Sequence, residues 1–128
     1  MEDFVLNFDF GYDSRTRNMK VPSFCDNYNI KYFNPDPYVQ VLCQDKFITK
    51  KFAENFGIKT PQSLLVFSHS YNKELLKNFN YPVIIKPNYE SESIGITQNS
   101  IVSNSNQADY LVKQLLKDFD GILIEEYI

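Results

Sequence analysis

A lysine at the end of an apolar run, followed by a short polar loop, is the part of this sequence best suited to chemistry. Lys86 ends the run that begins at Val83. The loop residues that could contact a ligand are Ser91, Glu92, Ser93 and Gly95. Backbone N–H groups and serine hydroxyls can donate to phosphate oxygens, glycine permits close approach or a positive φ, and lysine adds positive charge. The segment predicts a phosphate-binding loop, with an exposed hairpin and a solvated lysine as the alternative.

Two other segments place charged groups where a ligand could meet them. Lys46 lies at the expected start of a helix, where the helix dipole and free N–H groups favour anions. Glu125 and Glu126 end the last apolar run of the sequence. Because alternate strand residues point to opposite faces, one of the two could turn inward and accept a hydrogen bond. A solvated lysine and two solvated glutamates are the alternatives.

Alternating helices and strands must position these groups. The elements expected before residue 45 are a strand over 3–8 followed by a turn at Gly11, a helix over 19–28, a strand over 30–33 and a helix over 38–44. Those expected after it are a helix over 45–56 closed by Gly57, a strand over 63–67, a helix over 71–79, a strand over 83–85, two weak strand segments within 94–102, a helix over 106–119 and a strand over 121–127. Apolar residues recur with helical or strand periodicity in each. The pattern predicts a fold that contains both helices and strands, of the α/β (α+β) class.

Composition narrows the class of protein. The 128 residues are 43% hydrophobic and 23% charged, which is typical of a folded domain rather than a disordered chain. A formal net charge of −3 argues against a nucleic-acid partner, because phosphate neutralisation needs clustered Lys and Arg. Cys25 and Cys43 lack CxxC spacing, and no apolar run approaches the length of a membrane span. We therefore expect a cytoplasmic protein without a zinc site, disulfide or membrane contact.

The order of these segments resembles the D-alanine–D-alanine ligase family of ATP-grasp enzymes over nearly the whole chain. That family carries a DK-x-x-x-K helix, a strand ending in Lys-Pro, a Ser-x-Gly loop and a Glu-Glu-aromatic-aliphatic hinge, in this order. The matching residues are Asp45, Lys46 and Lys50, then Lys86 and Pro87, then Ser93, Ile94 and Gly95, and finally Glu125, Glu126, Tyr127 and Ile128. The stretch 11–46 is also similar to the family's approach to its first lysine.

The resemblance implies an ATP site. Lys46 and Lys86 would hold the phosphates, and the loop 90–95 would close over them. Glu125 would accept from the adenine amino group, and the backbone of Tyr127 and Ile128 would make the other adenine contacts. The implied architecture is part of a pre-ATP-grasp substrate domain, a strand–helix–strand unit over 1–44, followed over 45–128 by the N-terminal lobe of an ATP-grasp domain.

Two departures from the family pattern limit what it implies. The family loop usually has Gly-Ser-Ser, whereas this sequence has Ser91, Glu92 and Ser93. A carboxylate beside phosphate oxygens is repulsive unless a metal intervenes or the side chain turns away. In addition, the family's magnesium ligands and assisting arginine lie beyond the hinge, and the first strand and glycine-rich loop of its substrate domain lie upstream of this sequence. No residue is therefore named as catalytic or as a metal ligand.

Three hypotheses follow. The first is the ATP-binding portion of an ATP-dependent carboxylate–amine ligase, using ATP and Mg²⁺ and an amino acid or other carboxylate as substrate through an acylphosphate. The second is a degenerate relative that acts as a non-catalytic nucleotide-binding or interaction module. The third is an unrelated small domain. The isolated chain is expected to be inactive, and unburied apolar faces could promote a homo-oligomer.

Overall fold

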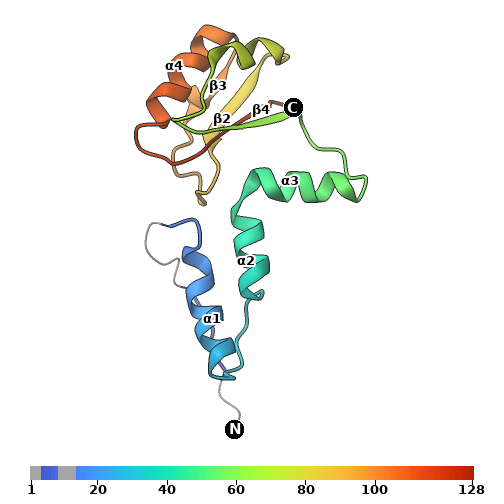
Figure 1. Cartoon of the computed structure of the whole chain (residues 1–128), viewed down its shortest axis with the longest axis vertical. Helices are drawn as coiled ribbons and strands as arrows, with labels where there is room; N and C mark the ends of the chain where they lie inside the picture. The colour runs from blue at the N-terminus through green and yellow to red at the C-terminus, as the bar shows by residue number, and fades with distance from the viewer. Residues whose placement is uncertain (1–3, 9–13) are drawn as a thin grey trace. The chain divides into compact units, whose positions relative to one another are not determined.

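The computed structural model describes residues 4–8 and 14–128 and divides into two compact units, Met1–Asp45 and Lys46–Ile128 (Figure 1). Helices and an antiparallel sheet make up the described parts, so the predicted α+β class is confirmed. The turn predicted at Gly11 lies outside the described residues. None of the helices in the described ranges is both long and apolar enough to span a bilayer.

The regular structure in the described part of the first unit is helical. Its elements are η1 (Arg17–Met19), α1 (Lys20–Asn27) and α2 (Pro37–Gln44). Asp36 starts α2, because its carboxylate accepts from the Val39 N–H at 2.9 Å. Pro37 occupies the first helical position, where a backbone N–H would have no intrahelical partner. The helices predicted over 19–28 and 38–44 are confirmed.

The two strands predicted in this unit do not form in its described part. Residues 4–8 and 30–33 meet only in one isolated parallel bridge, between Val5 and Tyr32. Phe4, Leu6 and Phe8 are 65%, 50% and 79% exposed, so these three apolar side chains are largely uncovered. The strand prediction was wrong because an apolar run forms a strand only where neighbouring strands and a packed surface support it.

The second unit is built on a four-stranded antiparallel sheet in the order β1-β4-β2-β3. The strands are β1 (Ser63–Val66), β2 (Val83–Pro87), β3 (Ile101–Val102) and β4 (Ile122–Glu126). β4 lies between β1 and β2, and Ile124 is paired with Leu64 on one side and with Ile85 on the other. The strands predicted over 63–67, 83–85 and 121–127 are confirmed.

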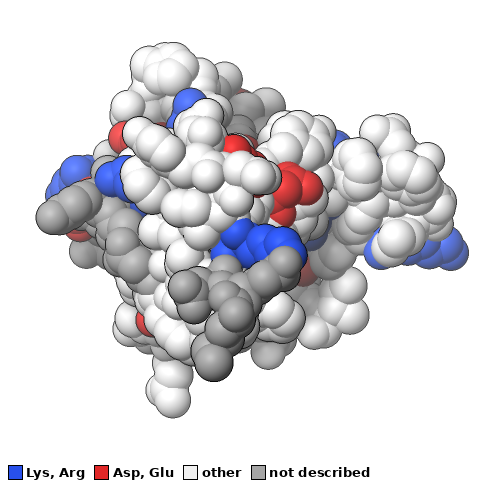
Figure 2. All heavy atoms as spheres, turned by 90° about the horizontal axis from the view of Figure 1, so that it is seen from below, with Lys and Arg blue, Asp and Glu red and all other residues white. Residues whose placement is uncertain are grey.

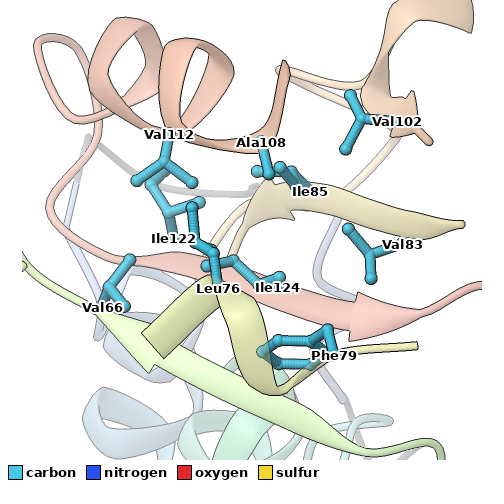
Figure 3. Close-up of a cluster of buried hydrophobic side chains, with 10 residues drawn as sticks. All are labelled: Val66, Leu76, Phe79, Val83, Ile85, Val102, Ala108, Val112, Ile122 and Ile124. Atoms are coloured by element: carbon cyan, nitrogen blue, oxygen red, sulfur yellow. The ribbon is translucent and has the colours of Figure 1, made fainter. Parts of the chain in front are cut away.

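One face of this sheet is covered by α4 (Ser105–Leu115) and η2 (Lys73–Asn78). Figure 3 shows the buried side chains that the sheet, α4 and η2 contribute to the core. Those with no exposed surface are Leu76, Val83, Ile85, Ala108, Val112, Ile122 and Ile124. The strand members alternate along β2 and β4, which places them on the same face. The helix predicted over 106–119 is therefore confirmed as a core-covering helix, and Asn104 starts it by accepting from the Gln107 N–H at 3.0 Å.

α3 (Lys46–Asn55) is the helix predicted over 45–56. Gly57 follows it at φ +76°, the left-handed conformation that commonly ends a helix. The helix prediction is confirmed together with its glycine stop. Its apolar residues are only partly covered in this unit, since Phe52 and Phe56 are 47% and 71% exposed.

Two other predictions for the second unit need correction. The α-helix predicted over 71–79 is the 3₁₀-helix η2, a form that suits a short segment. Of the strands predicted within 94–102, only β3 forms, because η3 (Gln98–Ser100) occupies the centre. The Ser100 hydroxyl accepts from the Thr97 N–H at 2.9 Å, and such local side-chain bonds compete with a strand ladder.

Candidate functional site

Two of the predicted ligand-binding charges, Lys86 of β2 and Glu125 of β4, lie on the sheet face opposite α4. In the β2–β4 register Lys86 is paired with Leu123, and Ile84 is paired with Glu125. Lys86 and Glu125 are therefore diagonal neighbours on one face, and long side chains can span such a diagonal of about 7–8 Å. The core residues of both strands alternate to the other face. The register thus separates the charged groups from the hydrophobic core.

Glu125 is the centre of an ion cluster that joins three elements. Its Oε2 accepts from Lys50 Nζ of α3 at 2.5 Å, and its Oε1 accepts from Lys86 Nζ of β2. The side chains of Lys50, Lys86 and Glu125 are 14%, 18% and 12% exposed. Two positive charges therefore share one negative charge at a site from which most water is excluded, and the cluster carries one positive charge in excess.

The environment of Glu125 favours its ionised form. Burial by itself would raise the pKa of the carboxyl, because it removes the charged form from water. Hydrogen bonds from Lys50 and Lys86, together with their charges, outweigh burial and hold the pKa of Glu125 below its ordinary value. The cluster is therefore a lysine–carboxylate–lysine arrangement at neutral pH.

Lys46, the predicted phosphate ligand of the helix, contacts main-chain oxygens. Its Nζ donates to Pro87 O at 3.2 Å, to Asn88 O at 3.1 Å and to Glu90 O. Its backbone N–H also donates to Asn88 O, at 3.4 Å. These bonds attach the first residue of α3 to the segment that leaves β2. In this structure Lys46 holds the base of the 90–95 loop.

Asn88 is a site-forming residue that the sequence analysis did not single out. Its side chain is fully buried, and Oδ1 accepts from the Phe47 N–H at 2.9 Å, which satisfies a free N–H at the start of α3. Its own N–H donates to Gly121 O at 2.9 Å. Asparagine commonly caps the start of a helix. The N–H group that Asn88 caps belongs to a residue 41 positions earlier in the chain, so local sequence patterns could not reveal this contact.

Lys50 is the second residue that received no ligand-binding role from the sequence. It lies four positions after Lys46, so both project from the same side of α3. The spacing was therefore a usable signal. What the spacing could not provide was the partner, because Glu125 lies 75 residues further along the chain.

The polar loop contains two successive turns. The Ile94 N–H donates to Ser91 O at 3.0 Å, and the Ile96 N–H donates to Ser93 O at 2.9 Å. In the first turn both central residues are left-handed, with φ +52° at Glu92 and +63° at Ser93, as a type I′ turn requires. Both side chains are exposed. Left-handed non-glycine residues are strained, and such strain is concentrated at functional loops.

Gly95 allows this loop to pack closely against β2. It has φ +75°, and a Cβ atom there would lie 2.5 Å from Pro87 Cγ and 3.1 Å from Phe119 Cζ. The positive φ predicted for Gly95 is present, and the close approach is to the protein's own proline ring, whereas an approach to phosphate stays a prediction. The glycine fixes the distance between the loop and the strand that carries Lys86.

The last three predicted hinge residues, 126–128, have different surroundings. The carboxylate of Glu126 accepts from Asn80 Nδ2 at 3.1 Å, so it is not part of the lysine cluster. The Tyr127 N–H donates to Pro82 O at 3.0 Å, which leaves the carbonyl as the backbone group of Tyr127 that could meet a ligand. The Ile128 side chain is exposed.

Other charges are spread in small groups. Among the described residues on the face shown in Figure 2, uncharged residues, drawn in white, cover more of the surface than Lys, Arg, Asp and Glu. Within residues 4–8 and 14–128, no three His, Cys, Asp or Glu side chains are grouped so that they could hold a metal ion. We therefore assign no Mg²⁺ ligand to the described residues, and the Mg²⁺ expectation remains a prediction.

No protein-family model matches the chain. Over 97% of its length it is 33% identical to a D-alanine–D-alanine ligase of Petrotoga mobilis and 31% identical to one of Helicobacter pylori. Among solved structures, a D-alanine–D-alanine ligase from Helicobacter pylori has a TM-score of 0.80 at 29% identity over 98% of this chain. One from Bacillus anthracis, complexed with ATP, has a TM-score of 0.82 at 24% identity over the same share.

The chain spans little more than a third of these proteins. It covers 37% of the Petrotoga mobilis sequence and 35% of the Helicobacter pylori sequence. For the two solved structures the shares are 37% and 40%. The similarity therefore extends over almost all of this chain and over a limited part of each relative.

Proposed function

From the premise that this chain corresponds, over nearly all of its length, to part of a D-alanine–D-alanine ligase-like protein of the ATP-grasp superfamily, we propose a function. The chain provides the phosphate- and adenine-binding side of an ATP site. The observation that carries the proposal is the cluster of Lys50, Lys86 and Glu125, with its excess positive charge. The cluster lies at the strand end from which the strained 90–95 loop departs.

The phosphates would be bound by the lysines and the loop. An ammonium and a phosphate oxygen about 4 Å apart attract by about 4 kcal/mol at an effective dielectric near 20, before desolvation is subtracted. The Lys86 ammonium has three N–H donors, so it could bind a phosphate oxygen while it keeps its contact with Glu125. Lys46 would join them by exchanging carbonyl partners for phosphate oxygens. Ser91, Ser93 and the loop N–H groups would supply further donors.

The adenine would lie near the end of β4. Glu125 is ionised and therefore only accepts hydrogen bonds, which suits the amino group of adenine. The carbonyl of Tyr127 and the backbone of Ile128 follow directly in the chain and would contact the ring edge. In the whole protein, ATP would phosphorylate a carboxylate, an amine would attack the acylphosphate, and an amino acid or related carboxylate would be the substrate.

The test is ATP binding by calorimetric titration of the 128-residue chain and its Lys86→Ala variant. Loss of one charged contact is expected to weaken binding by about tenfold or more. Lys77→Ala is the matched control, because it also removes one lysine but from an exposed pair with Glu74 in η2. Circular dichroism would establish that both variants are folded. If Lys86→Ala binds ATP as tightly as the parent chain, Lys86 is not a phosphate ligand.

The second candidate is a non-catalytic nucleotide-binding or interaction module, and Glu92 is the observation that favours it. A carboxylate at the first strained position of the loop repels phosphate oxygens. Glu92→Ser should therefore tighten ATP binding, with Glu90→Gln as a control for the loss of a loop charge. An unchanged affinity in Glu92→Ser would remove this argument for a degenerate site.

A further inference from the structure

Lys50 connects the ion cluster to α3, although Lys86 alone could neutralise Glu125. The two lysines bind different oxygens of the carboxylate, Lys50 at Oε2 and Lys86 at Oε1. A carboxylate held at one oxygen can still rotate about its side-chain torsions. Held at both oxygens, and largely buried, it has one orientation. Lys50 therefore restricts the direction in which Glu125 presents its remaining lone pairs.

A nearby hydroxyl offers the Glu125 carboxylate an alternative hydrogen-bond partner. Ser63 of β1 is paired with Glu125 of β4, and directly opposite side chains in an antiparallel pair lie about 5 Å apart. The Ser63 hydroxyl oxygen is buried and has no hydrogen-bond partner among the residues that the structure describes. A carboxylate is a good acceptor for such a hydroxyl, yet Glu125 is bound by the two lysines instead. Without Lys50, the Oε2 oxygen could turn to Ser63.

We propose that Lys50 is a positioning residue that holds the Glu125 carboxylate away from Ser63, so that the site prefers a purine with a 6-amino group over one with a 6-oxo group. This inference rests on the proposed function, since it concerns the same nucleotide. A fixed carboxylate accepts from the 6-amino group of adenine. It repels the 6-oxo oxygen of hypoxanthine, because both are acceptors.

The experiment compares ATP with inosine triphosphate, which has the same phosphates and ribose but a 6-oxo base. Binding of each is titrated calorimetrically to the 128-residue chain and to its Lys50→Ala, Lys50→Arg and Lys51→Ala variants. Lys51 is the control, because it is the next residue of α3 and its partner is the exposed Glu54. The readout is the ratio of the two affinities, which a general loss of charge or stability does not change.

The parent chain is expected to prefer ATP by about tenfold, the effect of one hydrogen bond to a charged group. Lys50→Ala should lose most of this preference, Lys50→Arg should keep it, and Lys51→Ala should leave it unchanged. Ser63→Ala in the Lys50→Ala background should restore part of it by removing the competing hydroxyl. Lys50→Gln replaces Lys50→Ala if circular dichroism shows that the alanine variant is unfolded.

The outcomes separate this inference from the proposed function. If the parent chain binds neither nucleotide, the proposed ATP site is wrong and this inference falls with it. If the parent chain binds both nucleotides equally, or if Lys50→Ala keeps the full preference, the ATP site stands and the role of Lys50 is refuted. Equal weakening of both nucleotides in Lys50→Ala would show that Lys50 contributes only charge.

Discussion

Replacing Gly95 by alanine should destabilise the second unit far more than the same replacement at Gly57. Both glycines have nearly the same backbone, with φ +75° and +76°. A Cβ atom at Gly57 would meet no atom of the described residues within 4 Å, whereas one at Gly95 would lie 2.5 Å from Pro87 Cγ and 3.0 Å from Pro87 Cδ. The pair therefore separates the cost of a left-handed alanine from the cost of a steric clash.

The expected magnitudes follow from these two contributions. A left-handed alanine costs roughly 1–2 kcal/mol, and this applies at both sites. The clash at Gly95 adds about 1–3 kcal/mol, typical of overpacking. Pro87 cannot rotate away, because its ring is fully buried in β2. We expect a loss of unfolding free energy of about 1–2 kcal/mol for Gly57→Ala and of about 2–5 kcal/mol for Gly95→Ala.

Urea unfolding followed by circular dichroism measures both variants on the same scale. The reduced entropy of the unfolded chain stabilises each alanine variant by a similar amount, so that it cancels in the difference. If Gly95→Ala and Gly57→Ala lose the same free energy, the loop does not pack on Pro87 as the structure has it. The placement of the predicted phosphate loop beside Lys86 would then be wrong as well.

Two further predictions concern the core and the ion cluster. Ile85→Ala should lower the free energy of unfolding by about 2–5 kcal/mol, because Ile85 is fully buried. Ile48→Ala should lower it by less than about 1 kcal/mol, because Ile48 is 46% exposed. Urea unfolding measures both variants, and similar losses would contradict the assigned core. The pKa of Glu125 is lower in the folded chain than its ordinary value of 4.5, so its contribution to stability is present above that value and is lost as pH falls through the folded pKa. The midpoint temperature of thermal unfolding should therefore fall less steeply between pH 7 and pH 3 for Glu125→Gln than for the parent chain. Identical profiles of this temperature against pH would show that Glu125 is not held by the lysines.

The elements best predicted from the sequence are those with strong local signals. α3 combines helical apolar spacing with the stop at Gly57, and β2 and β4 are short apolar runs bounded by Pro82 and Gly121. Such patterns depend on neighbours within a few residues, so the sequence contains them completely. The predictions failed where local bonds of Thr97 and Ser100 displaced a strand, and where the runs at 4–8 and 30–33 found no sheet to join.

The sequence by itself determined which residue types were available for binding an anion: the lysines of α3 and β2, the serine-containing loop and the glutamate of β4. Only the tertiary structure decided how they are combined. The β2–β4 register places Lys86 and Glu125 on one face, and α3 adds Lys50 from 75 residues away. The structure also turned Lys46 toward carbonyl oxygens and left Glu126 outside the cluster. Pairing between distant segments depends on strand register and helix packing, which no local pattern of apolar and polar residues specifies.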